Sequence, residues 1–273
     1  MRRESKLLPI IFIVFSFCAV AEERVVSSLG RLEPENGVVQ LAGPSGGGMT
    51  GAVIKTLQVA EGDWVEKDQV VARLDSYDLR SAEVARLNAI VANARNEVTR
   101  QKDLDRSSLT SKVKLDETQL NLDIALADLA AAEASLELAL VRAPLRAQVL
   151  EIHAHPGERV GPEGIMELGR TDRMYAVAEV YETDITGIKV GQLATIQAPA
   201  MSTELTGKVE RIALKVGRLD VVGTDPVAKT DARVVEVFIL LDDSEAVSRF
   251  TNMQVKVEIQ PCCLGRSRSA GCS

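Results

Sequence analysis

The stretch from Ser76 to Val141 most constrains the fold, because it contains no proline and no glycine. It is rich in Ala, Leu, Glu, Asp, Lys and Arg, whose side chains lose little rotamer freedom in a helix. In its second half a leucine recurs every seven residues, and a small residue follows three positions later. The leucines are Leu115, Leu122, Leu129 and Leu136, and the small residues are Thr118, Ala125, Ala132 and Ala139. This alternation of large and small seam positions lets a neighbouring helix approach closely.

The first half of the same stretch carries a second, weaker seam at heptad spacing. It consists of Val84, Leu87, Val91, Ala94, Val98 and Gln101. Two seams in one stretch without helix breakers predict two antiparallel helices packed on each other. Residues 76–141 are therefore expected to form an α-helical coiled-coil hairpin.

The composition excludes several classes of function. A chain of 273 residues is long enough for two or three small domains. Its formal net charge is −7 and only 3% of its residues are aromatic, so it lacks the basic and aromatic clusters of nucleic-acid-binding proteins. No nucleic-acid partner is expected.

The cysteines lie outside the expected folded body. They are Cys18, Cys262, Cys263 and Cys272, with none between residues 19 and 261. Neither a disulfide framework nor a cysteine-based metal site is therefore expected in the body. The tail, residues 261–273, shows no hydrophobic periodicity and is expected to be disordered, with its role left open.

Residues 1–24 have the pattern of an export segment. Arg2 and Arg3 precede an apolar run of about 15 residues, which would span about 22 Å and fall short of a roughly 30 Å hydrocarbon core. Ala19-Val20-Ala21 matches the small-residue pattern of a cleavage site, which favours a signal peptide over a retained membrane anchor. A lipoprotein anchored at Cys18 is disfavoured because the bulky Phe17 precedes it. In each case the rest of the chain is expected to be exported.

A short motif repeats on either side of the helical stretch. The sequence Glu61-Gly62-Asp63-Trp64-Val65 is similar to Pro156-Gly157-Glu158-Arg159-Val160. Each copy has residues typical of strands on both sides. A repeat that cannot bury its apolar face alone is expected to pack on the other copy of the repeat. Residues 25–75 and 142–171 are therefore predicted to contribute two halves of one small β-sandwich. The hairpin would be an insertion that projects from this sandwich.

Residues 172–260 are predicted to form a second β-domain. Short β-rich segments alternate there with turns at Gly187, Gly191 and Gly207, which is typical of a small β-barrel. The segment from Gly217 to Asp231 is polar and is expected to be a loop. The last strand, Met253 to Ile259, alternates strictly and is expected to be half-buried.

This order of elements closely resembles the HlyD-like periplasmic adaptors, also called membrane fusion proteins. The flanking halves resemble a split biotinyl/lipoyl domain, and Arg142-Ala143-Pro144 followed by Val149 resembles the family's return from hairpin to sandwich. Ala147 and Asp68 stand where glycine is usual in the family. The resemblance implies a mainly β fold, with a lipoyl-like sandwich, an inserted hairpin and a small barrel.

Three residues near the middle of the helical stretch match the hairpin-tip motif of adaptors that serve TolC-type channels. Arg100, Leu104 and Ser111 have the spacing Arg-x3-Leu-x6-Ser. The resemblance implies that they bind the periplasmic end of an outer-membrane channel. The competing interpretation is that these three residue types are common in any coiled coil. The main support for the tip assignment is therefore the location of the motif at the centre of the helical stretch.

Three further runs resemble the DevB-type branch, whose members work with ABC exporters. They are Leu29-Gly30-Arg31-Leu32-Glu33-Pro34-Glu35, Ala176 through Ile185, and Thr224 through Val237. The resemblance implies a protein in the periplasm, associated with the inner membrane and partnered by an ABC transporter and a TolC-type channel. It also implies a homo-oligomer, a hexamer in the family. An adaptor of an RND-type pump is the alternative, and the transported substrate is not indicated.

A cofactor carrier or an enzyme is disfavoured. A biotin or lipoate carrier needs a lysine at the turn between the half motifs, and here Asp78 lies near that position. His153 and His155 would face the same side of a strand and could ligate a metal, with Glu151 at the same parity, but ordinary polar surface residues are the favoured interpretation. We identify no catalytic set, and expect no cofactor.

Overall fold

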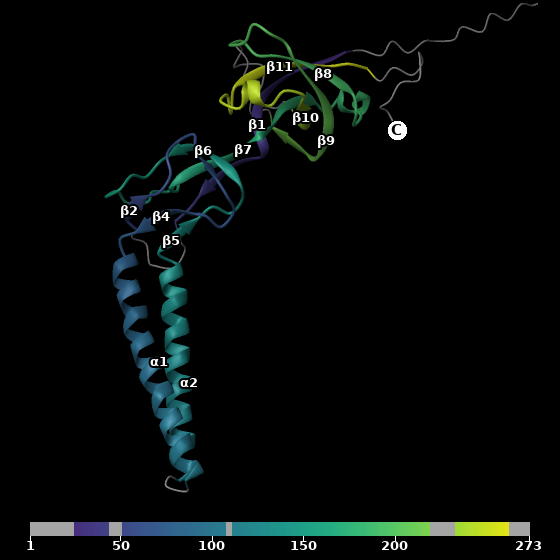
Figure 1. Cartoon of the computed structure of the whole chain (residues 1–273). Helices are drawn as coiled ribbons and strands as arrows, with labels where there is room; N and C mark the ends of the chain where they lie inside the picture. Colours follow the sequence, from purple (N-terminus) through teal and green to yellow (C-terminus); the bar gives the residue numbers. More distant parts are fainter. Residues whose placement is uncertain (1–24, 44–50, 108–110, 219–232, 262–273) are drawn as a thin grey trace, which may run out of the picture.

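The computed structural model describes residues 25–43, 51–107, 111–218 and 233–261. The molecule is elongated and bent, with a helical hairpin extending from one of two β-lobes (Figure 1). Three predicted features lie outside the described residues: the export segment 1–24, most of the predicted loop after Gly217, and the cysteine-containing tail. No helix in the described part is both long and apolar enough to span a membrane.

The predicted hairpin consists of α1 (Tyr77–Arg106) and α2 (Lys112–Glu137), which lie side by side (Figure 1). Both heptad seams face the interface between the helices. The buried residues of the hairpin are Leu87, Val91 and Val98 from α1, and Thr118, Ala125 and Leu129 from α2. The seams thus hold the two arms together, as the repeat predicts.

The second helix ends earlier than expected. Leu140–Arg142 form strand β5 rather than a last helical turn, and Ala139 lies beyond the helix with its side chain fully buried. The helix ends here because the backbone forms hydrogen bonds with the sandwich instead. Leu74 N donates to Ala139 O at 3.0 Å, and β5 pairs with a strand of the sandwich. The seven-residue pattern continues through Ala139 although the helix does not.

The sandwich is built from strands of both flanking halves. One sheet contains β2 (Ile54–Leu57), β4 (Val70–Leu74) and β5, so that β4 from before the hairpin pairs with β5 from after it. The facing layer contains β3 (Trp64–Val65), β6 (Ala147–Ile152) and one end each of β7 (Met166–Tyr181) and β1 (Val26–Leu41). Residues from both halves, including Ile54, Val71 and Val149, share one hydrophobic core. The split sandwich predicted from the repeat is confirmed.

The repeated glycine turns have matching backbone geometry. Gly62 has φ +89° and Gly157 has φ +90°, a conformation that L side chains rarely adopt. Gly62 N donates to Val149 O at 2.8 Å, and Gly157 N donates to Ile54 O at 2.8 Å. Each turn therefore hydrogen-bonds the strand of the opposite half. Asp68 has φ +66°, so it does occupy a turn position that favours glycine.

The second lobe is a closed barrel. It comprises β8 (Leu193–Gln197), β9 (Leu205–Arg218), β10 (Arg233–Leu241), β11 (Gln254–Ile259) and the remaining parts of β1 and β7, with the β1–β7 pairing closing the ring. Two short 3-10 helices, Ile185–Gly187 and Glu245–Val247, lie between strands. Leu32, Met174, Ile239 and Ile259 are among the buried residues of its core. The predicted barrel is present.

Strands β1 and β7 differ from the short strands that the sequence predicts. Each is 16 residues long and belongs to both lobes, and they pair with each other from Leu29–Glu179 to Leu41–Met166. The pairing is irregular between Pro34 and Val39. The two lobes are thus joined by a continuous two-stranded ribbon (Figure 1).

Candidate functional site

The three predicted tip residues lie at the far end of the hairpin from the sandwich. Arg100 and Leu104 are in the last two turns of α1, and Ser111 immediately precedes α2. The structure therefore brings the three together at one end of the molecule, as the spacing requires for a tip. Their role in binding a channel remains a prediction.

Ser111 has a structural task of its own. Its backbone is extended (φ −90°, ψ 147°) and its Oγ accepts a hydrogen bond from Lys114 N at 3.2 Å. This is the ordinary geometry of a serine at a helix N-cap. A serine at this position is therefore partly explained by helix capping, independently of any partner.

Arg100 presents its guanidinium to solvent. Its side chain is 64% exposed and its Nη2 lies 3.0 Å from Glu97 Oε2. Glu97 also accepts a hydrogen bond from Gln101 Nε2 at 2.8 Å. An exposed ion pair of this kind contributes at most about 1 kcal/mol. Arg100 can therefore exchange Glu97 for an acceptor on a partner at little cost in free energy. Leu104 is half-buried at the same end of the hairpin.

The sequence argument missed one apolar residue at the tip. Val113, in the first turn of α2, is 77% exposed. Its neighbours are charged, with the ion pairs Arg106–Asp103 and Lys114–Glu117 each at 3.0 Å. The sequence did contain a signal for Val113, because this residue is apolar but falls outside the heptad seam that packs between the helices.

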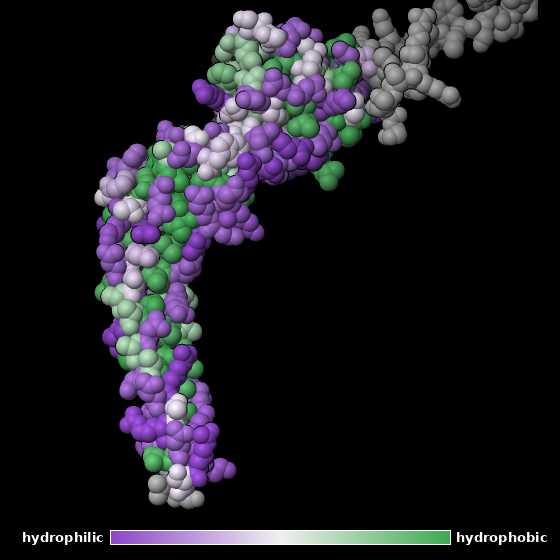
Figure 2. Space-filling view, in the orientation of Figure 1, coloured by the Kyte–Doolittle hydropathy of each residue, from purple (hydrophilic) through white to green (hydrophobic). Residues whose placement is uncertain are grey.

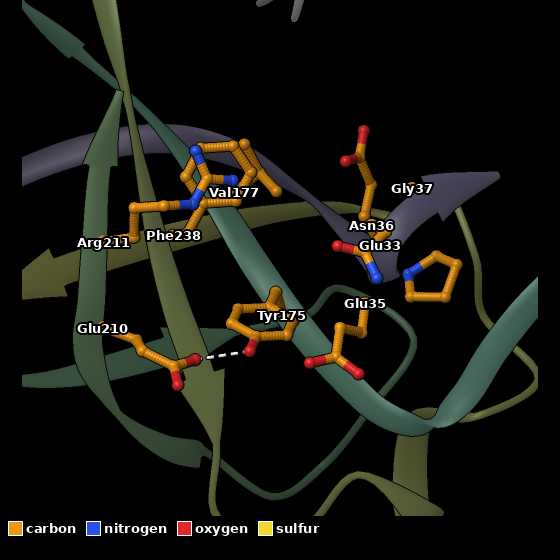
Figure 3. A pocket seen from close by; sticks show the side chains of 10 residues that line it. Glu33, Glu35, Asn36, Gly37, Tyr175, Val177, Glu210, Arg211 and Phe238 are labelled. Carbon is orange, nitrogen blue, oxygen red and sulfur yellow. Dashed lines mark hydrogen bonds between the residues drawn. The ribbon is translucent and has the colours of Figure 1, made fainter. Parts of the chain in front are cut away.

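A cavity of about 630 Å³ lies between the ribbon of β1 and β7 and the barrel strands β9 and β10. Figure 3 shows Tyr175 and Glu210 pointing toward each other across it, with Arg211 lying against Phe238. The Arg211 guanidinium carbon is 3.5 Å from the centre of the Phe238 ring. The lining residues are Glu33, Pro34, Glu35, Asn36, Gly37, Tyr175, Val177, Glu210, Arg211 and Phe238.

The charged groups around this cavity are paired with one another. Arg173 lies 3.2 Å from Glu35 Oε1 and 3.3 Å from Glu210 Oε1, and Arg170 lies 2.6 Å from Glu35 Oε2. The Tyr175 hydroxyl donates to Glu210. Burial, followed by this hydrogen bond, raises the pKa of Tyr175 to about 12. Among the described residues no serine, cysteine or histidine lines the cavity.

A second charged network lies on the barrel beside this cavity. Arg31 contacts Glu33 at 2.5 Å, and Glu179 and Glu236 at 2.9 Å each. Burial opposes the charged form of Arg31, but the hydrogen bonds that Arg31 donates to Glu33 and Glu236 outweigh it and raise the pKa of Arg31 above its ordinary value. The Glu179 side chain is only 1% exposed, so the network fixes a buried carboxylate between β1, β7 and β10.

The expected attachment point of a carrier domain holds Asp78. This residue is in the first turn of α1, its side chain is 67% exposed, and it forms an ion pair with Lys55. A carboxylate cannot form the amide through which biotin or lipoate is attached. The position therefore does not fit a cofactor carrier.

Comparisons with known proteins bear on the fold. No protein-family model matches the chain, and no curated protein matches its sequence. The crystal structure of a MacA-MexA chimeric protein, containing the Pseudomonas aeruginosa MexA alpha-hairpin domain, matches with a TM-score of 0.68 and 20% identity, over 88% of this chain and 79% of that chain.

Two natural proteins give similar matches. The membrane fusion protein Spr0693 from Streptococcus pneumoniae R6 has a TM-score of 0.63 and 16% identity, over 87% of this chain and 100% of that chain. MacA from Actinobacillus actinomycetemcomitans has a TM-score of 0.58 and 21% identity, over 87% of this chain and 78% of that chain. The chain therefore has the fold of the membrane fusion proteins, which confirms the predicted fold class.

Proposed function

We propose that the protein is a periplasmic adaptor that links an inner-membrane ABC transporter to a TolC-type outer-membrane channel. In this proposal the β-lobes dock on the transporter and the hairpin binds the channel. The adaptor is associated with the inner membrane and is exported by the segment 1–24. It performs no chemistry itself, and the transporter hydrolyses ATP.

The observation that carries the proposal is the shape of the hairpin and what lies at its end. The 30 residues of α1 and the 26 of α2 correspond to about 45 and 39 Å at 1.5 Å per residue. At the far end of this arm Arg100 and Val113 are exposed and Leu104 is half-buried, so polar and apolar groups lie there together. An arm with a chemically distinct end suits a protein that must bind a partner far from its base.

The outer face of α2 supports assembly with further copies of the chain. Figure 2 shows hydrophobic side chains interspersed with hydrophilic ones along the hairpin. On α2 an exposed row follows the 3-4 spacing of a helix face, and it is mostly apolar. It consists of Val113, Glu117, Leu120, Ile124, Ala127, Ala131, Ala134 and Leu138. Leu120 and Ile124 are 58% and 52% exposed, although leucine and isoleucine are usually buried.

The outer face of α1 carries a row with the same spacing but smaller side chains. It consists of Asp78, Ala82, Ala85, Ala89, Ala92, Asn96, Thr99 and Asp103, all exposed. By heptad geometry both rows point away from the seam, on roughly opposite sides of the hairpin. Ala92 and Ile124 are each about 20 Å from the sandwich end of their helices, since a residue adds about 1.5 Å.

The side chains of the two rows are therefore complementary in size, and the rows lie at similar distances from the sandwich end of the hairpin. We propose that the large side chains on α2 of one copy pack into the alanine row on α1 of the next. Such an interface uses two different faces of the chain, and it generates a ring when the rotation between copies closes. A hexameric ring is the number that the family resemblance implies.

The tip is tested by reversing charge and polarity at its end. Arg100→Asp and Leu104→Asp should abolish crosslinking of the adaptor to the outer-membrane channel in native membranes, because they remove a donor and an apolar contact. The circular dichroism of both variants should stay unchanged. Arg95→Asp and Leu79→Asp, on exposed positions of the same helix nearer its base, are the matched controls and should crosslink normally. Normal crosslinking by both tip variants would remove the tip assignment.

The class of transporter is tested separately. Affinity purification of the adaptor from native membranes, followed by mass spectrometry, should recover an ABC transporter. Recovery of an RND pump instead would reject that part of the proposal while leaving the adaptor function in place.

A further inference from the structure

One side-chain cluster has the composition of a metal site and lies well away from the hairpin tip. Glu151 on β6 and Glu167 on β7 are directly opposite each other in the antiparallel ladder. His153 follows two residues after Glu151, and its backbone N donates to Ile165 O at 2.9 Å, which holds it beside the same ladder. One ligand atom from each of the three side chains lies within 4.8 Å of the others.

The imidazole of His153 is poorly satisfied without a further partner. Its Nε2 is buried and has no hydrogen-bond partner in the part of the chain that the structure describes. Glu167 Oε1 lies 3.5 Å from Nε2, which is long for a hydrogen bond, and Glu151 Oε1 lies 3.9 Å from Nδ1. A buried nitrogen that is left unpaired costs free energy, so the arrangement is incomplete as it stands.

The spacing suits two ligands of one ion. Imidazole nitrogen and carboxylate oxygen bind Zn²⁺ at about 2.0 to 2.2 Å, so ligands in a tetrahedral arrangement are about 3.3 to 3.6 Å apart. The distance of 3.5 Å between Nε2 and Glu167 Oε1 falls in this range. The Glu151 side chain is 64% exposed and has the freedom to turn its carboxylate toward the same point.

The cluster is open to solvent on one side. Glu151 and Glu167 line a cavity of about 560 Å³ between the sandwich and a barrel loop, together with Glu61 and Arg249. The cation of Arg249 opposes a metal ion, but three carboxylates outnumber it. Three protein ligands with an open side match zinc sites that keep one position for water or another small ligand.

We propose that Glu151, His153 and Glu167 bind one divalent transition-metal ion of the Zn²⁺ type. The proposal is independent of the adaptor function, because none of the three residues lies at the tip or on the outer faces of the hairpin. A bound ion would join β6 to β7 within the sandwich lobe. This replaces the expectation of ordinary surface residues for His153 but not for His155, which is exposed and lies 3.6 Å from Glu158.

The test is calorimetric titration of the full chain with Zn²⁺ after removal of metal by a chelator. All four cysteines are replaced by serine, so that thiolates cannot bind the ion. We expect one Zn²⁺ per chain, and binding weaker by roughly tenfold or more in His153→Gln and Glu167→Gln. His155→Gln, at the other histidine of the chain, should bind as tightly as the parent protein.

Two further measurements keep the proposal open to rejection. Glu151→Gln alters a side chain that is 64% exposed, so the variant is expected to fold, and it should also weaken binding. Co²⁺ should give the visible absorption of a four-coordinate site in the parent protein, and Zn²⁺ should raise its melting temperature but not that of His153→Gln. The absence of stoichiometric binding would show that the three residues form only an ion-paired cluster. Equal loss of binding in His155→Gln would likewise overturn the assignment.

Discussion

Ser111 has an observed role in capping a helix and a proposed role in binding a partner. Its hydroxyl caps α2, and the same serine completes the motif that resembles a channel-binding tip. Aspartate and serine are both good N-cap residues, whereas alanine is not. The two roles can therefore be separated by substitution.

We expect Ser111→Ala to lower the free energy of unfolding by about 1 kcal/mol, because the cap is lost. Ser111→Asp should keep the stability of the parent protein in chemical denaturation. If the hydroxyl also binds the channel, Ser111→Asp will fail to crosslink to it despite its normal stability. Normal crosslinking by Ser111→Asp would show that the serine serves the helix alone.

Tyr175 makes stability depend on pH in the alkaline range. Its pKa is about 12 in the folded protein, against about 10 in an unfolded chain. Between these values the folded state holds a proton that the unfolded state has lost, so stability falls as the pH rises from about 10 to 12. Below about pH 10 the contribution is fully present.

Tyr175→Phe should therefore lose less stability than the parent protein between pH 9.5 and about 11.5. Chemical denaturation followed by circular dichroism at each pH measures this slope. Tyr181→Phe, at a tyrosine that is 43% exposed, is the control and should keep the parent slope. The same slope in the parent protein and in Tyr175→Phe would contradict the contribution of the Tyr175–Glu210 pair.

The residues of the candidate tip could be located from sequence because their positions follow from the helices. A hairpin of two similar arms must turn near its centre, and Arg100, Leu104 and Ser111 flank that centre. Val113 and the cluster of Glu151, His153 and Glu167 could not be found in this way. Val113 lies off the packed seam, and Glu167 reaches His153 only through the pairing of β6 with β7, which the sequence does not specify.

At the scale of elements, α2 carries two apolar rows with the same seven-residue period. One packs on α1 and was predicted from its leucines, and the other is exposed. A pattern of period seven identifies a helix face but not the partner that covers it. Only the structure shows which of the two rows is already used within the hairpin.

The proposed contact between copies predicts a specific disulfide. In a cysteine-free background, the double variant Ala92→Cys and Ile124→Cys should form intermolecular disulfides on mild oxidation, because the two positions lie at one height on neighbouring copies. Non-reducing gel electrophoresis should show a ladder of multimers that ends at the ring size. Within one chain the two residues lie on opposite outer faces, so an internal disulfide is not expected.

A mismatched pair provides the control for this experiment. Ala82 is ten residues from Ala92, about 15 Å along the helix, so Ala82→Cys with Ile124→Cys should crosslink much more slowly. Equally fast crosslinking of both pairs would contradict the proposed register. A dimer as the largest product would contradict a ring.

At the scale of the whole molecule, β1 and β7 unite the two lobes. Pro34, Asn36 and Gly37 are residue types typical of turns. Asn36 and Gly37 do have positive φ, at 68° and 75°. They form an irregularity within β1 rather than its end, since β7 continues to pair with β1 on both sides of it. The long-range pairing of β1 with β7 overrides this local turn chemistry, and it could not be predicted from the sequence.

The sandwich, barrel and hairpin were predictable for different reasons. The hairpin follows from local helix propensity and the heptads, and the sandwich from a repeat whose Gly62 and Gly157 have nearly equal φ values. The end of α2 was misplaced because Ala139 continues the heptad pattern while its carbonyl is taken by Leu74. Contacts between residues far apart in sequence set the end of α2 and the length of β1 and β7.

The hairpin leaves the sandwich from β4 and returns to it through β5, and these two strands are hydrogen-bonded neighbours. Its length is therefore a separate variable from the fold of its base. Adding or removing one heptad in each helix would change the reach by about 10 Å while keeping the seams in phase and the β4–β5 pairing untouched. A chain built in this way can be fitted by evolution or by design to gaps of different width, in steps of two helical turns, without alteration of either β-lobe.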